Sequence, residues 1–371
     1  NVMNIIQLSK FYPPIFGGIE QVAQDITEGM QNLCNVDVLS VNNSSKTIYC
    51  KNIIRASLLF TLLSTPVSIS YMLIWSRIRN NYDIIHVHLP NPLAIIALLL
   101  FPPKAPVVVH WHSDIVKQKI ALKFFQPLQN LFLNKVEKII VTSEIYGSSS
   151  PQLQRFQDKI ICIPIGIKSE RLPKNETLLK HLKEKYKNKK IVFSLGRLVY
   201  YKGFENLVNA ANFLPEDTII LIGGGGELYD ELADSILSNK LEGKVVLLGE
   251  IKYEQLSAYY QVCDVFCLPS IHESEAFGVV QIEAMSYGKP VVSTNIKNSG
   301  VPWVNENGIS GVVVEPNEPH ELAKAILTIL NNPAGFSLGA LERYRKLFTR
   351  DKMISSLIGL YQNIKIGNEK E

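Results

Sequence analysis

Short apolar runs alternate with segments of helical periodicity along the first half of the chain. Runs rich in valine and isoleucine lie at residues 4–9, 36–41, 83–88, 106–112 and 138–143. Helical patterns begin near Glu20, after Pro66, near Leu93 and near Ile120. Near-continuous apolar strands that alternate with helices are typical of a parallel sheet covered by helices on both faces.

The same pattern restarts in the second half. Apolar strands that each lead into a turn lie at residues 190–197, 218–225, 244–250, 265–270 and 290–294. The intervening residues, 166–190, are charged and poor in β-branched side chains, which predicts a hinge followed by a solvated helix.

We therefore expect two Rossmann-like, doubly wound α/β domains, 1–166 and 185–345, with the boundary near 166–188. A C-terminal helix, 346–371, is expected to cross back toward the first domain. Because ligands bind beyond the carboxyl ends of parallel strands, we expect the domains to face one another across a ligand-binding cleft.

Composition narrows the class of protein. A chain of 371 residues with 46% hydrophobic and 19% charged residues can bury two cores. The net charge of +4 comes without a basic run interleaved with aromatics, which argues against nucleic acid.

The cysteines and the apolar stretches indicate in which cellular compartment the protein resides. Five cysteines, odd in number and scattered, suit reduced thiols and form no zinc pattern. The first residues lack a signal-peptide pattern, and the apolar stretches at 53–75 and 93–101 are too interrupted or too short to span a bilayer. We expect a cytoplasmic protein.

The segment "PSIHESEAFGVVQIEAMSYGKPVV" carries the most specific chemistry. Seven residues separate Glu275 from Glu283, and a helix that begins near Ala276 would bring Glu275 to its start and Glu283 about two turns in. The free N–H groups at that start, on Phe277, Gly278 and Val279, would form a site for an anion such as a diphosphate. The alternative is an amphipathic helix with two solvated glutamates.

Two cations follow the first strand of the second half. In "SLGRLVYYKGFENLV", Gly196 and Arg197 come directly after the strand, and Lys202 lies in the loop to the next helix. These cations could neutralise a leaving diphosphate without a metal, and the chain contains no D-x-D pair for a divalent ion. We therefore expect no metal and no cofactor. The alternative is two surface cations.

Together these motifs resemble glycosyltransferase family 4, a family of retaining enzymes with the GT-B fold. The resemblance covers nearly the whole chain, through "FYPPIFGGIEQVAQDI", "HSDIVKQK", "GRLVYYKGFENL", "LIGGGGEL", "LLGEIKYEQLSAYY", "VFCLPSIHESEAFGVVQIEAMSYGKPVVST" and "NGISGVVV". "HSDIVKQK", "YYKG" and "SEAFG" also resemble bacterial O-antigen and polysaccharide members, including mannosyltransferases.

The resemblance implies that the second domain binds the donor. Arg197 and Lys202 would hold its diphosphate, Glu283 its ribose and Glu275 the transferred sugar. The base would lie against backbone groups near Ile251, with a side wall from the loop near Arg197.

In the first domain, which would bind the acceptor, Gly17 and Gly18 match the family's glycine loop. The loop's backbone would approach the phosphates and the acceptor; an ordinary tight turn is the equal alternative. "GGGGE", at 223–227, departs from the G-x-G-x-x-G fingerprint of dinucleotide-binding proteins and is interpreted as a turn packed near the donor.

Histidines lie on two predicted strands of the first domain. His112 matches the family's active-site histidine, where it could donate a hydrogen bond to a sugar hydroxyl or shield developing charge. We expect His110 to face away from His112 and to be structural. We expect His86 and His88 to have core or loop-supporting roles and not to form a metal pair.

The implied reaction is transfer of a hexose, with mannose from GDP-mannose as the lead, to an undecaprenyl-diphosphate-linked glycan in O-antigen or lipopolysaccharide synthesis. The donor's own β-phosphate oxygen would take the acceptor proton. UDP-sugars remain an alternative, as does an epimerase, hydrolase or phosphorylase on the same scaffold. An NAD-dependent oxidoreductase and a non-catalytic sugar-binding module are further alternatives.

The segment 117–138 combines lysines with phenylalanines. Its basic residues are Lys117, Lys119, Lys123, Lys135 and Lys138, and its aromatic residues are Phe124, Phe125 and Phe132. This pattern suits a helix that rests on an anionic membrane surface, at the inner face of the cytoplasmic membrane. The alternative is a core helix with solvated lysines.

Overall fold

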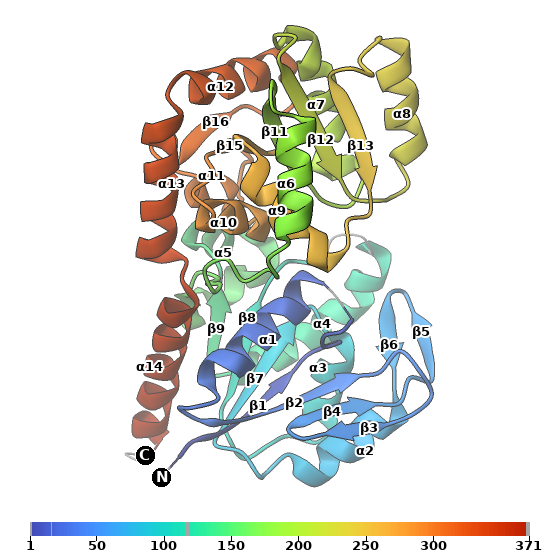
Figure 1. Cartoon of the computed structure of the whole chain (residues 1–371). Coiled ribbons are helices and arrows are strands. Elements are labelled where there is room, and N and C mark those ends of the chain that lie inside the picture. Colours follow the sequence, from blue (N-terminus) through green and yellow to red (C-terminus); the bar gives the residue numbers. More distant parts are fainter. Residues whose placement is uncertain (1, 16, 116–118, 369–371) are drawn as a thin grey trace. The chain divides into compact units, whose positions relative to one another are not determined.

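The computed structural model describes residues 2–15, 17–115 and 119–368, which form two compact units, each built on a parallel sheet (Figure 1). The first unit comprises residues 1–166 together with 350–371, and the second comprises residues 167–349.

The first unit has a mostly parallel sheet of eight strands in the order β10-β9-β8-β7-β1-β2-β4-β3, in which only the β3–β4 pair is antiparallel. A separate hairpin pairs β5 with β6. The strands are β1 (Asn4–Leu8), β2 (Asn35–Val41), β3 (Ile48–Cys50), β4 (Ile53–Ala56), β5 (Phe60–Leu62), β6 (Thr65–Val67), β7 (Ile84–Leu89), β8 (Val107–Trp111), β9 (Lys138–Val141) and β10 (Ile160–Cys162). The chain order reverses between β1 and β7, which makes this the switch point of the sheet.

Helices cover this sheet. They are α1 (Gly18–Met30), α2 (Ile69–Ile78), α3 (Pro92–Leu100), α4 (Lys119–Lys135), α5 (Glu144–Ser149), the 3-10 helix η1 (Pro151–Lys159) and α14 (Arg350–Asn368). Side chains of Ser68, Asn91 and Ser143 cap α2, α3 and α5 by accepting hydrogen bonds from free backbone N–H groups. The C-terminal helix α14 packs against α1, and Ile354 lies directly over Gly29.

The second unit has a parallel sheet in the order β13-β12-β11-β14-β15-β16, with its switch point between β11 and β14. Its strands are β11 (Lys190–Leu195), β12 (Thr218–Gly223), β13 (Val245–Gly249), β14 (Val265–Leu268), β15 (Val291–Thr294) and β16 (Gly311–Val314). Its helices are α6 (Glu176–Lys185), η2 (Tyr200–Lys202), α7 (Phe204–Ala210), η3 (Ala211–Phe213), α8 (Tyr229–Ser238), α9 (Tyr253–Val262), α10 (Val279–Ser286), α11 (Val301–Val304), α12 (Pro319–Asn331) and α13 (Pro333–Leu347).

Helix α6 is held within the second unit. It packs on α9, and just before it the Asn175 side chain donates to the backbone oxygen of Glu254 at 3.0 Å. The Ser257 hydroxyl donates to the backbone oxygen of Pro173 at 2.6 Å. The segment predicted as a hinge followed by a solvated helix therefore contains that helix, but one of its faces is packed within this unit.

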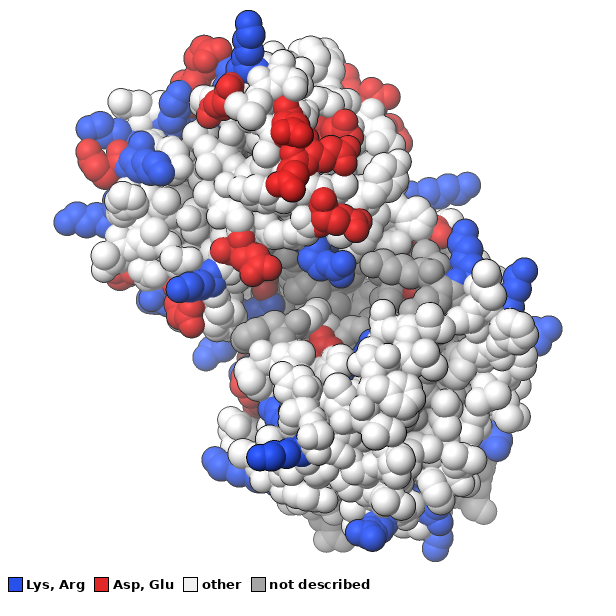
Figure 2. All heavy atoms as spheres, turned by 90° about the vertical axis from the view of Figure 1, so that its right-hand side faces the viewer, with Lys and Arg blue, Asp and Glu red and all other residues white. Residues whose placement is uncertain are grey.

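The predicted doubly wound α/β class is confirmed, because both sheets follow this pattern. On the face shown in Figure 2, acidic side chains gather on the second unit, whereas the middle of the first unit's face is mostly uncharged and basic side chains lie at its rim. The hairpin β5–β6 of the first unit exposes Phe60, Leu62 and Leu63.

Candidate active site

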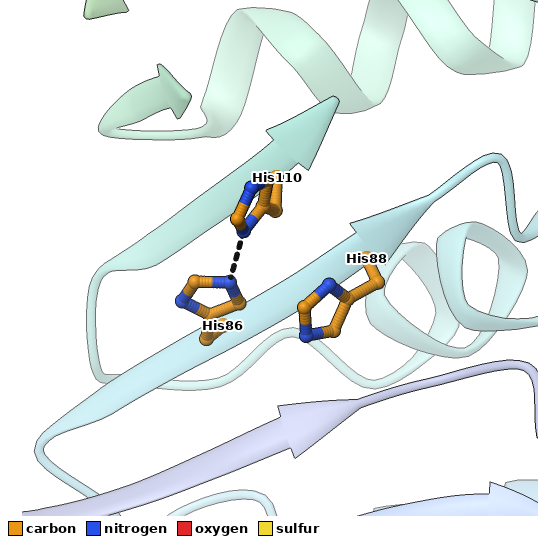
Figure 3. Close-up of side chains that lie close together, drawn as sticks. All are labelled: His86, His88 and His110. Carbon is orange, nitrogen blue, oxygen red and sulfur yellow. Dashed lines mark hydrogen bonds between the residues drawn. The ribbon is translucent and has the colours of Figure 1, made fainter. Parts of the chain in front are cut away.

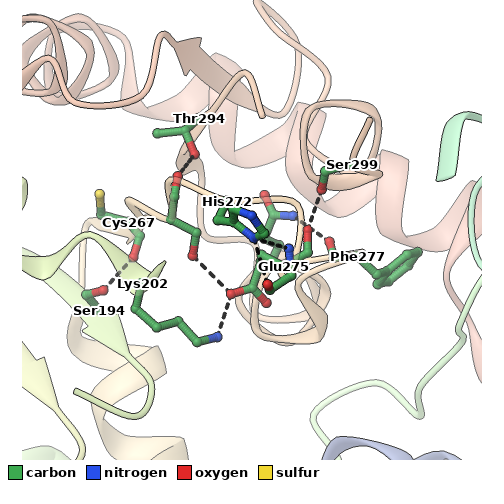
Figure 4. Close-up of polar contacts among 11 residues, drawn as sticks. Ser194, Lys202, Cys267, His272, Glu275, Phe277, Thr294 and Ser299 are labelled. Atoms are coloured by element: carbon green, nitrogen blue, oxygen red, sulfur yellow. Dashed lines mark hydrogen bonds and ion pairs between the residues drawn. The ribbon is translucent and has the colours of Figure 1, made fainter. Parts of the chain in front are cut away.

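Lys202 and Glu275 meet at the switch point of the second unit (Figure 4). Lys202 ends η2, in the loop after β11, and Glu275 lies in the loop after the neighbouring strand β14. The Lys202 Nζ donates to the Glu275 Oε2 at 2.5 Å, and the Ser270 hydroxyl donates to the same oxygen at 3.0 Å. Sequence reasoning singled out both residues but missed their direct contact, which joins loops far apart in the chain.

The ion pair is largely buried, with 14% of the Lys202 side chain and 11% of the Glu275 side chain exposed. Burial by itself would lower the pKa of Lys202, but the adjacent Glu275 carboxylate outweighs it and raises that pKa. Lys202 therefore stays protonated at neutral pH. The Arg197 side chain is exposed and has no hydrogen bond or ion pair within the described ranges.

Helix α10 begins at Val279, three residues later than expected from the sequence. The cause is Gly278, whose φ of 78° interrupts the helical backbone. A side chain on Gly278 would also lie 2.7 Å from the Leu268 Cδ2. Within the part of the chain that the structure describes, the N–H groups of Phe277, Gly278 and Val279 have no hydrogen-bond acceptor. Three free N–H groups at a helix start are suited to bind an anion.

Glu283 lies on α10 and is also paired. One carboxylate oxygen accepts from Arg171 and the other accepts from the Tyr260 hydroxyl at 2.7 Å. The Glu283 and Arg171 side chains are each 11% exposed. Burial and the nearby Glu283 carboxylate raise the pKa of Tyr260, so its hydroxyl keeps its proton and donates. Sequence reasoning found Glu283 but neither partner, because no local pattern marks the Arg171 contact.

The loops after β11, β12 and β13 are tied together through glycines. The Gly196 N–H donates to the Gly223 oxygen at 3.1 Å. Gly224 has a φ of +126°, and a Cβ there would lie 1.9 Å from the Gly196 oxygen. On the other side, Ile251 packs against Gly223. The glycine run is therefore a turn packed against Gly196 and Ile251.

Gly17 and Gly18 begin α1, directly after the loop from β1 at the switch point of the first unit. Gly17 is the N-cap and Gly18 is the first helical residue, and both are exposed. A Cβ on Gly18 would meet nothing within 4 Å, and one on Gly17 would meet only the flexible carboxylate of Glu20. Packing within the unit therefore does not require glycine at either position.

The histidines of β7 and β8, together with His112 directly after β8, lie on one side of the first sheet. The His110 and His112 rings stack with centroids 4.4 Å apart. The expectation that His110 faces away from His112 is wrong, because residues two apart on a strand project to the same side. His112 Nε2 is 2.9 Å from His88 Nδ1, and His86 Nε2 is 3.0 Å from His110 Nδ1.

Three of these histidines could in principle hold a metal ion. One nitrogen from each of His86, His88 and His110 lies within 4.8 Å of the others (Figure 3). All of their ring nitrogens except the His110 Nε2 already have a hydrogen-bond partner, including the Tyr361 hydroxyl on His86. We therefore interpret the cluster as a hydrogen-bonded network of histidines. Sequence reasoning considered these histidines one at a time and missed the network.

Two family models match the chain. Residues 176–347 match "Glycosyl transferases group 1", and residues 16–171 match "Glycosyltransferase Family 4". These ranges correspond closely to the two structural units.

Relatives of known type match over nearly the full length. The chain is 31% identical to the O-antigen chain mannosyltransferase C of Escherichia coli, over 98% of this chain and 99% of that protein. It is also 31% identical to the D-rhamnosyltransferase WbpZ of Pseudomonas aeruginosa, over 94% of this chain and 92% of that protein.

Solved structures of the same fold match as well. A sucrose-phosphate synthase from Thermosynechococcus elongatus superposes with a TM-score of 0.79 at 22% identity, covering 98% of this chain and 100% of that one. Anabaena HepE in complex with UDP-glucose superposes with a TM-score of 0.78 at 20% identity, covering 97% of this chain and 100% of that one. At these identities the likeness establishes the GT-B fold.

Proposed function

Because the chain belongs to the group 1 glycosyltransferases of family 4, we propose that it is a retaining, metal-independent hexosyltransferase that uses GDP-mannose. Its acceptor would be a lipid-linked glycan of the O-antigen type. The observation that carries this proposal is the full-length similarity to an O-antigen chain mannosyltransferase. The buried Lys202–Glu275 pair beside a helix start with free N–H groups supports it.

The proposed mechanism is electrostatic. Lys202, Arg197 and the start of α10 would stabilise the negative charge that grows on the nucleotide diphosphate as it leaves. The bond from the sugar's anomeric carbon to the phosphate oxygen breaks while a bond to the acceptor oxygen forms on the same face. The acceptor's proton passes to an oxygen of the departing β-phosphate, so no protein base and no metal is needed.

The remaining site residues would orient the donor. Glu275 would contact the transferred sugar with the oxygen that Lys202 leaves free. Glu283 would bind the ribose, since each of its oxygens has a lone pair beyond those that Arg171 and Tyr260 use. In the first unit His112 would contact the sugar, and Gly17 and Gly18 would give the phosphates and the acceptor close access to backbone.

A donor panel tests the proposal. Thermal stabilisation is measured with GDP-mannose, GDP-D-rhamnose, UDP-glucose and UDP-N-acetylglucosamine, each with and without EDTA. We expect GDP-mannose to raise the melting temperature most and EDTA to change nothing. Transfer to a synthetic lipid-linked acceptor should then give a product with the donor's anomeric configuration, read by NMR. Inverted product, or loss of stabilisation in EDTA, would overturn the corresponding part of the proposal.

A second candidate is a UDP-sugar donor. A structural neighbour, Anabaena HepE, is described in complex with UDP-glucose, and it shares the fold of this chain at 20% identity. Stabilisation by UDP-glucose in the same panel, with no response to GDP-mannose, would favour it. Release of free sugar without acceptor would instead indicate a hydrolase, and formation of an epimeric sugar nucleotide would indicate an epimerase.

A peripheral membrane contact through α4 is part of the proposal. Its outer face carries one apolar stripe at helical spacing, formed by Ile120, Phe124, Leu128 and Leu131, of which Phe124 is 81% exposed. The buried residues of this helix are Gln129, Phe132 and Leu133. Lys117 lies outside the described residues, and Lys119, Lys123 and Lys135 are exposed. An apolar stripe flanked by lysines is the pattern of a helix that lies on an anionic bilayer.

Among the residues that the structure describes, no helix combines the length and apolar character needed to cross a bilayer.

A further inference from the structure

Two hydrogen-bonded chains run through the four histidines that lie on β7, on β8 and directly after β8. One chain links the Tyr361 hydroxyl, His86 and His110, and it ends at the His110 Nε2, which is buried and has no partner among the described residues. The other links Gln7, His88 and His112. Here the His88 Nε2 lies 2.7 Å from the Gln7 Oε1, and the His88 Nδ1 lies 2.9 Å from the His112 Nε2. Only the second chain has a fixed direction.

The direction of hydrogen-bond donation along this chain is set by a backbone carbonyl, which can only accept. The Gln7 Nε2 donates to the Ala23 oxygen at 3.0 Å. It also donates to the Thr27 hydroxyl oxygen at 2.7 Å, while that hydroxyl donates its own proton to the Ala23 oxygen at 2.8 Å. If the Gln7 amide were reversed, its oxygen would face the Ala23 carbonyl oxygen, and two acceptors would lie in contact without a proton between them. The Gln7 oxygen therefore faces His88.

An amide oxygen accepts, so the His88 Nε2 must carry the proton of that hydrogen bond. Burial lowers the pKa of His88 well below its usual value, and the neighbouring histidines lower it further, so the ring is neutral and carries one proton. Its Nδ1 is then a bare acceptor. The His112 Nε2 must donate to it, and burial likewise lowers the pKa of His112 and keeps that ring neutral.

We propose that Gln7 and His88 are positioning residues that hold His112 as the Nε2–H tautomer, so that its Nδ1 accepts a hydrogen bond from a hydroxyl of the donor sugar. The identity of the ligand rests on the proposed function. His112 is half-buried, and its Nδ1 has no hydrogen-bond partner within the described ranges. A neutral His112 in this tautomer cannot donate to the sugar, which removes the donor role expected from the sequence.

The choice of tautomer affects which sugars bind well. A hydroxyl that donates to Nδ1 keeps both lone pairs of its oxygen for other donors, whereas a hydroxyl that accepts from a ring N–H uses one lone pair and keeps its own proton for another acceptor. A sugar with no hydroxyl at that position leaves the Nδ1 unpaired and loses a hydrogen bond, which corresponds to about a five- to tenfold change in kcat/KM.

Nitrogen NMR of the full-length protein without nucleotide tests the tautomer directly. The chain has seven histidines, and the signals of His88 and His112 are identified by their loss in His88→Gln and His112→Gln variants. We expect both rings to be neutral at pH 7.5, each with a protonated Nε2 and an unprotonated Nδ1. A protonated Nδ1 on His112 in the wild-type protein would overturn the proposal without any variant.

A matched pair of substitutions at Gln7 tests the positioning role. Gln7→Leu keeps the size but removes the acceptor, so His88 can reverse, and we expect His112 to show a mixture of tautomers. In Gln7→Glu the protonated acid can donate to the Ala23 oxygen while its other oxygen faces His88, and we expect this variant to restore the single Nε2–H tautomer. With the best donor, kcat/KM should fall about five- to tenfold in Gln7→Leu and recover in Gln7→Glu.

The outcomes separate this proposal from the proposed function. A slower Gln7→Leu enzyme with an unchanged His112 tautomer would show a structural role only and would overturn the positioning role. The expected spectra together with no transfer from any sugar nucleotide would overturn the proposed function, while the hydrogen-bond direction stands.

Discussion

The first unit buries its polar chemistry as neutral imidazoles, whereas the second buries it as ion pairs. In the first unit four histidines form two hydrogen-bonded chains, and burial lowers the pKa of each: His86, His88, His110 and His112. In the second unit Lys202 pairs with Glu275 and Arg171 with Glu283. Both arrangements satisfy buried polar groups, but they fail under different conditions.

A buried neutral network is destabilised by protonation, because among the described residues the hydrogen-bond partners of the four rings include no carboxylate that could neutralise an added charge. A buried ion pair fails when one partner is removed, because the other charge is left uncompensated. The comparison therefore separates the two units experimentally: acid should unfold the first, and single substitutions at the pairs should damage the second.

The largest expected effect is acid destabilisation of the first unit. Burial lowers the pKa of His110 from 6.5 to about 3, so the unfolded chain binds more protons below pH 6.5. Its contribution is fully present above the unfolded pKa and is lost as pH falls toward the folded pKa. At about 1.4 kcal/mol per pH unit, His110 alone costs about 2 kcal/mol by pH 5. Burial lowers the pKa values of the other three histidines as well, so protonating them adds to the loss in the same direction.

Hydrogen exchange read by mass spectrometry between pH 7 and pH 4.5 resolves the units within the intact chain. We expect β7 and β8 to lose protection before β11 and β14 do. His110→Phe should reduce the pH dependence of the first unit, and His181→Phe, at an exposed position on α6, should change nothing. Simultaneous loss of protection in both units would contradict the comparison.

The second effect concerns the Arg171–Glu283 pair. We expect Arg171→Ala to lower the free energy of unfolding by about 3 kcal/mol, because it leaves the buried Glu283 carboxylate with only the Tyr260 hydroxyl. Urea unfolding followed by circular dichroism measures it.

The matched control is Lys187→Ala, which removes an exposed pair with Glu184 and should cost no more than about 0.5 kcal/mol. Adding Glu283→Gln to Arg171→Ala should recover part of the loss, since no unpaired charge then remains. Equal effects of Arg171→Ala and Lys187→Ala would mean that the buried pair contributes no more than a surface pair.

The third effect is catalytic. We expect Lys202→Ala to lower turnover about a hundredfold at saturating donor while the fold is kept, because one preorganised positive charge on the leaving diphosphate is lost. Lys244→Ala is the control, since it removes a cation of the same unit that pairs with the exposed Glu216. Single-turnover rates measure both. Turnover near the wild-type value in Lys202→Ala would exclude the assigned role.

The fold could be predicted from sequence because its signal is local. Valine- and isoleucine-rich runs such as those of β7 and β12 predicted buried parallel strands, and the structure contains them. The short strands between Ile48 and Val67 were missed, because strands of three or four residues are too short to show a period. The start of α10 was set too early, because Gly278 adopts a left-handed conformation that composition does not reveal.

The sequence predicted candidate residues of the site and the strand ends that carry them, but it did not predict the contacts between these residues. The Lys202–Glu275 and Arg171–Glu283 contacts join residues 73 and 112 positions apart, and such pairings depend on sheet order. The network around His88 was missed because each histidine was considered singly. Its direction depends on Gln7, on a different strand, and on the backbone oxygen of Ala23.

The smallest effect expected here concerns the surface of the first unit. If the apolar stripe of α4 enters the head-group region of a bilayer, Phe124→Ser removes one aromatic contact and should weaken binding to anionic vesicles about tenfold. Sedimentation with phosphatidylglycerol vesicles at low salt measures the change, and added salt should weaken binding of both proteins through the lysines. Phe213→Ser, at an exposed position of the second unit, is the matched control. Phe213 lies outside the proposed membrane-binding stripe, so its substitution should leave vesicle binding unchanged. An equal loss of binding in both variants would contradict attachment through α4, and so would a wild-type protein that does not bind vesicles.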